Sequence, residues 1–350
     1  MVVKNYIKRY YFLVMLFICS CSSVNDNIFN VKAKISKLPD TIELTGQMVD
    51  IGSYDVLNIS DIQIFDSILV IKGSVLSSEY FFHTFSIPQK TYCGSFVAKG
   101  RGAKEMLDPT MRGYIKNKQN EILVNMMEVN LKTAYNWNLS QSILKGQTEL
   151  AQSYVLEKLT FDLYPKDLDY VAIYPKGNDL YCSSIDATKQ YEDIASLYPG
   201  VSVMDNIDKL SSPTVFNGKT NQLVMSMMML PQINFLDVNT KEKKTTAVSI
   251  EFKNWKNILQ KDNKDLTIHY IDCTQSDDFF IALYANATFE NWSNGMYEPH
   301  LHFCDWEGNV IYDFKIGQTL KAIAYDKLHD TLYGVDVNDD LYSYNFGAIN

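Results

Sequence analysis

A short stretch near the end of the chain, EPHLHFC, places two histidines and a cysteine at alternate positions. Alternate side chains of a β-strand point to the same face, so His300, His302 and Cys304 would share one face. Two imidazoles and a thiolate can bind Zn²⁺ or a copper ion, with Glu298 just outside as a fourth group. The favoured interpretation is a face that packs against a neighbouring unit without a cofactor, and one divalent metal ion is the alternative.

The loop before this stretch, FENWSNGMY (residues 289–297), mixes aromatic with polar side chains. Its aromatic residues Phe289, Trp292 and Tyr297 could stack on sugar rings or hold a peptide. Loops of this kind that interrupt a regular unit often carry function. These three residues are therefore candidate ligand contacts, and a loop packed on the core without a ligand is the alternative.

No pattern in the sequence predicts a catalytic residue. The nucleophile pattern GxSxG is absent, and the five histidines are scattered along the chain. Residues 336–342, DVNDDLY, resemble a Ca²⁺ loop but have Gly347 where the glutamate ligand should stand, so a turn is favoured. The net charge of −9 and the lack of a basic run beyond the first residues argue against a nucleic-acid partner.

The first residues have the pattern of an export signal. Lys4, Lys8 and Arg9 precede an apolar run that is too short to span a membrane. The sequence Ile-Cys-Ser-Cys at residues 18–21 then resembles a bacterial lipobox, whose cysteine is acylated and becomes the new N-terminus. We therefore expect a signal peptide over residues 1–20 and lipidation of Cys21, and the alternative is an ordinary secretory signal.

The resemblance to a lipobox implies a membrane as one partner. Each acyl CH₂ group contributes about 0.8 kcal/mol on entering a bilayer, so several chains on one residue form a durable anchor. Residues 21–30 would be the lipidated cysteine and its tether. The expected location is the cell envelope, at the outer membrane. In some bacteria, several acidic residues beside the anchor would indicate the surface face. Asp26 is the only acidic residue there, so the sequence does not decide between the periplasmic and the surface face.

The rest of the chain contains a repeat of a polar turn followed by a hydrophobic strand. The aligned positions in the six copies are separated by 54, 57, 43, 57 and 52 residues. Those positions are Leu69, Leu123, Leu180, Leu223, Phe280 and Leu332. Each unit can hold four strands of about 5 to 6 residues. We therefore predict an all-β fold, a six-bladed β-propeller of four-stranded blades over residues 31–350, against the alternative of two separate sandwiches.

The last unit is too short for a complete blade, because only 18 residues follow Leu332. Residues 28–37 and 41–52 read as strands that belong to no earlier unit. An N-terminal strand would complete the last blade and remove an open sheet edge.

The segment SFVAKGRGAKEMLDP, residues 95–109, resembles a pattern of the TolB-like six-bladed propeller lipoproteins of Bacteroidetes-type bacteria. Gly100, Arg101, Gly102 and Glu105 match it, whereas residues 103–104 depart from the usual Pro-Gly. The resemblance implies the propeller fold and an envelope location but no activity. Because glycine tolerates positive φ angles, we expect these residues to form a structural turn.

These observations predict a lipid-anchored envelope propeller that acts as a non-catalytic binding or scaffolding module, with an envelope protein, peptide or glycan as partner. A metal-dependent, lactonase-like hydrolase and a glycan-binding component of nutrient uptake are the alternatives. The remaining cysteines are expected to be buried small side chains, although an oxidising compartment would allow disulfides. They are Cys93, Cys182, Cys273 and Cys304.

Overall fold

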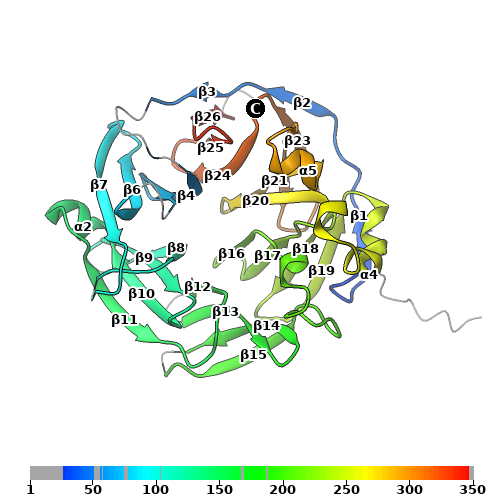
Figure 1. Ribbon diagram of the computed structural model, residues 1–350, viewed down its shortest axis with the longest axis horizontal. Helices are drawn as coiled ribbons and strands as arrows, with labels where there is room; N and C mark the ends of the chain where they lie inside the picture. Colours follow the sequence, from blue (N-terminus) through cyan, green and yellow to red (C-terminus); the bar gives the residue numbers. More distant parts are fainter. Residues whose placement is uncertain are drawn as a thin grey trace, which may run out of the picture.

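Six β-sheets surround a central axis in the computed structural model (Figure 1). The structure describes residues 27–50, 56, 58–74, 78–102, 104–166, 169–186 and 188–346. This arrangement confirms the predicted all-β, six-bladed propeller. No helix in these ranges is long and apolar enough to cross a membrane.

The first three blades each consist of four consecutive antiparallel strands. Blade 1 contains β4 (Ile59–Phe65), β5 (Ile68–Gly73), β6 (Tyr80–Ser86) and β7 (Thr91–Ala98). Blade 2 contains β8 (Thr110–Lys116), β9 (Ile122–Glu128), β10 (Thr133–Asn138) and β11 (Leu150–Val155), with helix α2 (Leu139–Lys145) before its last strand. Blade 3 contains β12 (Asp162–Lys166), β13 (Asp169–Lys176), β14 (Asp179–Ile185) and β15 (Tyr191–Ser196).

The last three blades carry the longer insertions. Blade 4 contains β16 (Thr214–Asn217), β17 (Gln222–Ser226), β18 (Gln232–Asp237) and β19 (Lys243–Ala247), and α3 (Ile207–Leu210) precedes it. Blade 5 contains β20 (Thr267–Gln275), β21 (Phe279–Thr288), β22 (His300–Asp305) and β23 (Val310–Ile316). The short helices η1 (Ile250–Asn254), α4 (Trp255–Ile258) and η2 (Asn263–Asp265) precede blade 5, and α5 (Phe289–Ser293) lies within it. Blade 6 contains β24 (Leu320–Asp326), β25 (Thr331–Asp336) and β26 (Leu341–Asn345).

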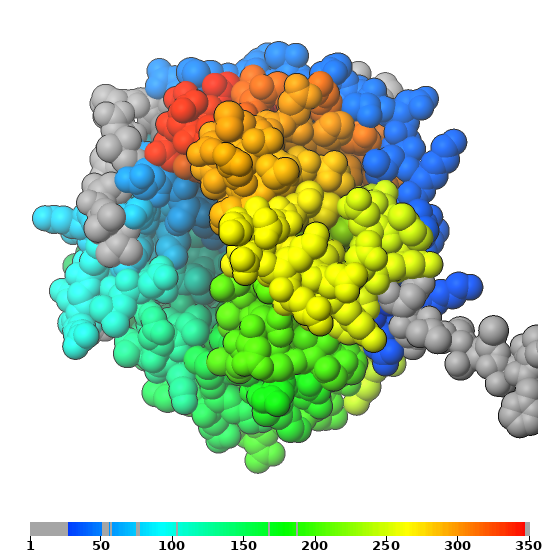
Figure 2. Space-filling view, turned by 45° about the vertical axis from the view of Figure 1, so that its right-hand side comes forward, coloured from blue at the N-terminus to red at the C-terminus, as the bar shows by residue number. Residues whose placement is uncertain are grey.

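The N-terminal segment runs along the outer edges of three successive blades, and we call β1, β2 and β3 together the N-terminal belt. The strand β1 (Ala33–Ile35) pairs in parallel with β19, and β2 (Thr41–Leu44) pairs in parallel with β23. The strand β3 (Gln47–Met48) pairs antiparallel with β26 as the fourth strand of blade 6. Figure 2 shows this belt in blue beside the orange and red blades. Closure of the last blade by an N-terminal strand is thus confirmed.

The repeat locates the same strand in five of the six blades. Leu69, Leu123, Leu223, Phe280 and Leu332 all lie in the second strand of their blades. The alignment is wrong in blade 3, where the residue chosen, Leu180, lies in the third strand, β14. The reason is physical: β13 and β14 form a hairpin of two similar apolar strands, and the turn at Gly177, with φ of 62°, gives β14 the stronger signal. This shift by one strand explains the uneven spacings of 57 and 43 residues.

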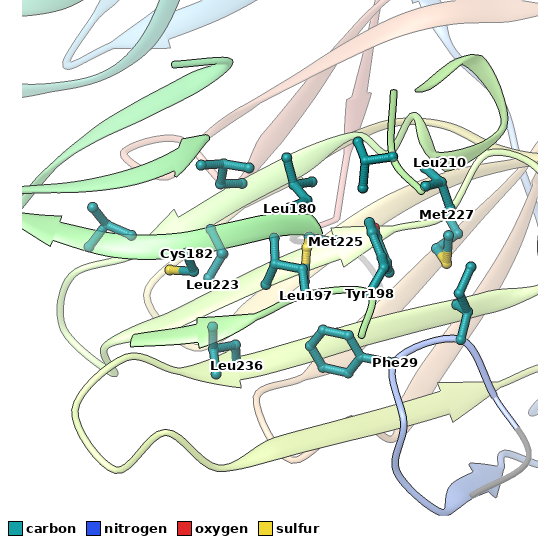
Figure 3. Close-up of a cluster of buried hydrophobic side chains, with 14 of the residues drawn as sticks. Phe29, Leu180, Cys182, Leu197, Tyr198, Leu210, Leu223, Met225, Met227 and Leu236 are labelled. Atoms are coloured by element: carbon teal, nitrogen blue, oxygen red, sulfur yellow. The ribbon is translucent and has the colours of Figure 1, made fainter. Parts of the chain in front are cut away.

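Apolar faces of neighbouring blades pack against each other and hold the ring together. Figure 3 shows the cluster between blades 3 and 4, where Leu180 and Cys182 meet Leu223 and Leu236. Phe29, which is fully buried, joins this cluster just before the belt begins. Burial of a ring of this size contributes about 1.5 to 3 kcal/mol, so Phe29 fixes the start of the belt.

Candidate functional site

The innermost strands of all six blades surround the central axis (Figure 1). They enclose a cavity of about 440 Å³, which we call the central channel. Its size falls in the range of about 300 to 1,000 Å³ that is usual for small-ligand sites. Its mouth lies at the hairpins that follow these strands, where Asp66, Lys219, Asp277 and Lys327 line it.

Side chains tie each inner strand to the next blade, and we call these contacts the hydrogen-bond ring. Its first five contacts are Gln63 Nε2 to Met111 O (2.9 Å), Arg112 Nε to Asp162 Oδ1 (2.6 Å), Tyr164 Oη to Thr214 O (3.0 Å), Gln275 Nε2 to Phe216 O (2.7 Å) and Ile323 N to Asp272 Oδ2 (2.7 Å). The circle closes between blades 6 and 1, where Asp339 accepts the backbone N–H groups of Asn58 (2.7 Å) and Ile59 (2.9 Å). The polar lining of the channel therefore also joins the blades.

The inner part of the channel contains ionisable groups that interact electrostatically. Burial, and secondarily the carboxylate of Asp61, raises the pKa of Asp272 to about 8. Burial also raises the pKa of Asp61, although the guanidinium of Arg112 opposes this. Together with Asp162, the partner of Arg112, three carboxyl groups surround a single guanidinium. The inner part of the channel therefore favours an additional positive charge, whose arrival would displace the proton of Asp272.

A second cavity, of about 450 Å³, lies on the flank of blade 5. We call it the crevice pocket. Its wall contains His300, His302 and Asp313 of blade 5, and Leu38 of the linker between β1 and β2. The flank faces blade 4, because Cys304 on the same face of β22 packs in one cluster with side chains of β17 and β18.

Asp313 organises the polar wall of the crevice pocket. Its Oδ1 atom lies 2.7 Å from His300 Nδ1, and its Oδ2 atom accepts the hydroxyl of Thr41 in the belt at 2.8 Å. His302 Nε2 lies 3.7 Å from Asp313 Oδ1, which is too long for a hydrogen bond. Burial lowers the pKa of His302 to about 4, so this ring is neutral at physiological pH.

The structure does not bring the predicted metal ligands together. Although His300 and His302 line one pocket, Cys304 lies deeper, in an apolar cluster with Tyr270 and Phe280. Burial raises the pKa of the Cys304 thiol, which disfavours the thiolate that a metal needs. Within the described ranges, no three His, Cys, Asp or Glu side chains are arranged to hold a metal ion.

The aromatic residues of the loop separate into two groups. Phe289 and Trp292 have ring centroids 5.7 Å apart and pack on a small buried cluster that includes Leu266 and Ile268. Tyr297 lines the crevice pocket and donates a hydrogen bond of 2.7 Å to Leu320 O. Of the three predicted ligand contacts, Tyr297 therefore lines the crevice pocket, whereas Phe289 and Trp292 line neither this pocket nor the central channel.

The Gly-Arg-Gly segment forms a turn between blades 1 and 2. Gly102 N donates to Glu105 Oε2 at 2.8 Å. Gly100 has φ of 150°, and a Cβ atom there would lie 1.9 Å from Glu105 Oε2, so only glycine fits. Arg101 is exposed, and the predicted lipidation site Cys21 lies outside the described residues.

The remaining sequence predictions concern turns and cysteines. The segment that resembles a Ca²⁺ loop is a turn, in which Asp336 Oδ1 accepts the N–H groups of Asn338 (2.8 Å) and Asp340 (3.0 Å). Cys182, Cys273 and Cys304 are free and buried, whereas the free Cys93 is half-buried.

Sequence reasoning missed the ionisable residues of the channel. Asp61, Arg112 and Asp272 come from three different blades, so no local pattern connects them. A usable signal existed in these three inner strands, namely a charged residue within a run that otherwise reads as buried. The acidic partner of His300, Asp313, was missed for the same reason, since it lies on the next strand.

Six blades around a channel, closed by an N-terminal strand, define the class of six-bladed β-propellers. The family model for TolB-like 6-blade propeller-like proteins matches residues 59–328. The chain belongs to this family, as its Gly-Arg-Gly segment suggested. A search of the curated proteins finds no match.

Solved structures from Bacteroides are similar in fold. A member of the DUF4221 family from Bacteroides vulgatus is 12% identical, with a TM-score of 0.58, over 90% of this chain and 98% of that one. A protein from Bacteroides fragilis that is described as exported is 10% identical, with a TM-score of 0.53, over 89% of this chain and 98% of that one. At these identities the similarity concerns the fold alone.

Proposed function

We propose that the protein is a lipid-anchored, non-catalytic binding module of the cell envelope whose ligand enters the central channel. The observation that carries this proposal is the cavity inside the hydrogen-bond ring, with excess carboxyl groups around Arg112. Fold alone does not define a function, so the proposal depends on this site and on the lipobox-like sequence.

The charges of the channel favour a ligand with a protonated amine. The amine would lie between Asp61 and Asp272, where one additional positive charge is favoured. Gln275 also lines the channel, and its buried Oε1 atom has no partner within the described chain, so it can accept a hydrogen bond from a ligand. At the mouth, Lys219 and Lys327 flank Asp277 at 3.9 Å and 3.2 Å and suit an acidic group on the outer end of the ligand.

Calorimetry with simple amines tests this site. Cadaverine and L-lysine should bind to the full chain, and their N-acetylated derivatives should bind more weakly because acetylation removes the charge. Asp61→Asn should weaken binding by about tenfold, the loss expected when one charged hydrogen-bond partner of about 1.4 kcal/mol is removed. Asp108→Asn is the control, because that carboxylate pairs with Lys72 outside the channel. Equal binding by the acetylated probes, or by Asp61→Asn, would refute the amine site.

Acylation is tested separately, by feeding cells that express the full chain an alkyne analogue of palmitate. The chain should become labelled, and Cys21→Ser should abolish the label. Cys19→Ser is the matched control and should keep it. Label on Cys21→Ser or its loss in Cys19→Ser would contradict the predicted lipidation site.

A metal-dependent hydrolase is a weaker candidate. It requires a set of ligands at the channel, and the described residues there contribute two neighbouring carboxyl groups and a guanidinium instead.

A further inference from the structure

The crevice pocket contains a buried hydrogen-bond donor without a protein partner. His302 is fully buried, and its Nδ1 atom lies 3.2 Å from Tyr270 Oη. This contact is the only hydrogen bond that the Tyr270 hydroxyl makes in the described structure, so the hydroxyl donates and the proton of the neutral ring lies on Nε2. Nε2 has no hydrogen-bond partner in the described residues. A buried donor of this kind is unfavourable unless a bound group accepts from it.

A second histidine is held in position for a ligand. Asp313 binds His300 through Nδ1, which leaves Nε2 without a hydrogen bond among the residues described. The His300 side chain is 28% exposed and lines the pocket, so its free nitrogen is accessible. An imidazole oriented by a carboxylate is restricted in rotation and loses little entropy when it binds.

The backbone at the pocket has a left-handed residue. Asn286 lies within β21 and has φ of 44°, in a region where asparagine is enriched among the residues other than glycine. Asn286 lines the pocket and is exposed, so its amide can both donate to and accept from a ligand.

The pocket also offers apolar and aromatic surface. Tyr284 stacks on His302 with ring centroids 4.5 Å apart, and it lines the pocket together with Tyr297 and Leu38. Tyrosine combines a flat apolar face with a polar tip, which suits a ligand with both kinds of surface.

These groups select a class of ligand. An anion would be repelled by Asp313 and Glu298, which both line the pocket. A cation would compete for Asp313 with two donors that are already bound, His300 and Thr41. A neutral ring with neighbouring hydroxyl groups can accept from His302, donate to His300 and place its apolar face on Leu38 and Tyr297.

From these contacts we infer that the crevice pocket is a second binding site, separate from the central channel, for a sugar unit at the end of a glycan. Both pockets have the volume of small-ligand sites, but they open at opposite ends of blade 5. The central mouth adjoins the turn before Phe279, at the start of β21, whereas the crevice pocket includes Thr288, at its end. Ten residues of an extended strand separate these ends by about 30 Å.

Saturation-transfer NMR on the full chain tests this inference with a panel of neutral monosaccharides: glucose, galactose, mannose, fucose, xylose and the N-acetylated hexosamines. At least one sugar should receive saturation from the wild-type chain. His300→Gln should weaken its binding by about tenfold, because a hydroxyl of the ligand would lose its partner. The absence of transfer to every sugar in the panel would overturn the inference.

The chain supplies a matched control for His300→Gln. His329 Nδ1 lies 2.6 Å from Asp326, another buried aspartate, but neither residue lines either cavity. His329→Gln should therefore bind the sugar like wild type. Equal effects of the two substitutions, or binding by His300→Gln that matches wild type, would overturn the inference.

A second variant tests the pocket without the risk that the chain fails to fold. Asn286→Gly keeps the positive φ angle without strain and removes only the amide side chain. It should be at least as stable as wild type and should bind the sugar several-fold more weakly. Unchanged affinity in Asn286→Gly together with unchanged affinity in His300→Gln would show that the pocket does not bind the sugar.

Discussion

The central channel and the crevice pocket have similar volumes, about 440 and 450 Å³, but they are built in different ways. All six blades contribute to the channel, and many of its polar groups already bind one another across blade boundaries. Blade 5 and the belt linker alone form the crevice pocket, where two imidazole Nε2 atoms keep their capacity for hydrogen bonds. In the channel, stability and ligand binding depend on the same groups, whereas in the crevice pocket they can be separated.

The largest expected effect of a substitution on stability is in the channel. Arg112→Met removes the guanidinium that lies among three carboxyl groups and breaks a contact between blades 2 and 3. Removal of one partner of a fully buried pair costs about 3 to 5 kcal/mol, and because the side chains of Arg112 and Asp162 are 29% and 16% exposed, we expect about 2 to 3 kcal/mol. Urea denaturation measures this loss.

Two comparisons sharpen this result. Lys219→Met, at the exposed mouth, should change the unfolding free energy by less than about 0.5 kcal/mol. His300→Gln in the crevice pocket should cost less than about 1 kcal/mol, since the imidazole is partly solvated. A cost for His300→Gln as large as that for Arg112→Met would break the proposed difference between the two regions.

The two regions should also respond to pH in opposite directions. Burial lowers the pKa of His302 in the crevice pocket to about 4, as it does for His83 and His269 outside both cavities, so the unfolded chain takes up protons first as the pH falls. Their contribution to stability is fully present above about pH 6.5 and is lost toward pH 4. Asp272, whose pKa is raised to about 8, favours the folded state when protonated; this contribution is fully present below about pH 4 and is lost as the pH rises to 8.

Thermal unfolding between pH 6.5 and 8 tests Asp272 through the difference between the wild-type chain and Asp272→Asn, because Lys243, whose pKa burial lowers to about 8, contributes in the opposite direction at the top of this window. The melting temperature should fall across this window in the wild-type chain, and Asp272→Asn should flatten the decline. His302→Gln should instead reduce the loss of stability between pH 6.5 and 4. Wild-type slopes in both variants would show that these groups do not determine the pH response.

A smaller effect is expected where the belt meets the crevice pocket. Thr41→Val removes the hydroxyl that donates to Asp313 at 2.8 Å and should lower the unfolding free energy by about 1 kcal/mol. Thr133→Val is the control, because its hydroxyl donates to the nearby Leu131 O at 3.0 Å within the same blade and not to a separate element, and it should have less effect. A larger loss of unfolding free energy in Thr133→Val than in Thr41→Val would mean that the contact between Thr41 and Asp313 does not hold the belt.

No effect is expected from removal of metal. Elemental analysis of the full chain, purified without an affinity metal, should find less than one equivalent of zinc, copper or calcium, and a chelator should leave the melting temperature unchanged. One bound equivalent would favour the metal-dependent hydrolase and would contradict the amine site.

The fold was more predictable from the sequence than the sites. Turns and apolar strands recur along the chain, so their spacing revealed the number of blades, and the short last unit revealed the closure. The pattern could not distinguish β13 from β14, because both strands of that hairpin are equally apolar. The two-residue period of a β-strand correctly placed His302 and Cys304 on one face. His302 lines the crevice pocket, however, whereas Cys304, two residues further along the strand, lies in an apolar cluster. Which of these environments a residue meets depends on the neighbouring blade, which a local sequence pattern does not contain.

The belt determines where a mechanical load would enter the molecule. A pull on the N-terminus meets Phe29 and β1 on blade 4 first, then β2 on blade 5, and only then β3, whose pairing with two residues of β26 closes the ring. These contacts lie in series, so the early ones shield the closure from tension. Because Thr41 of β2 binds Asp313, tension strong enough to peel away β2 would also release the carboxylate that orients His300. If Cys21 anchors the chain to a membrane, movement of that membrane relative to a bound partner would act on the crevice pocket before it opened the propeller.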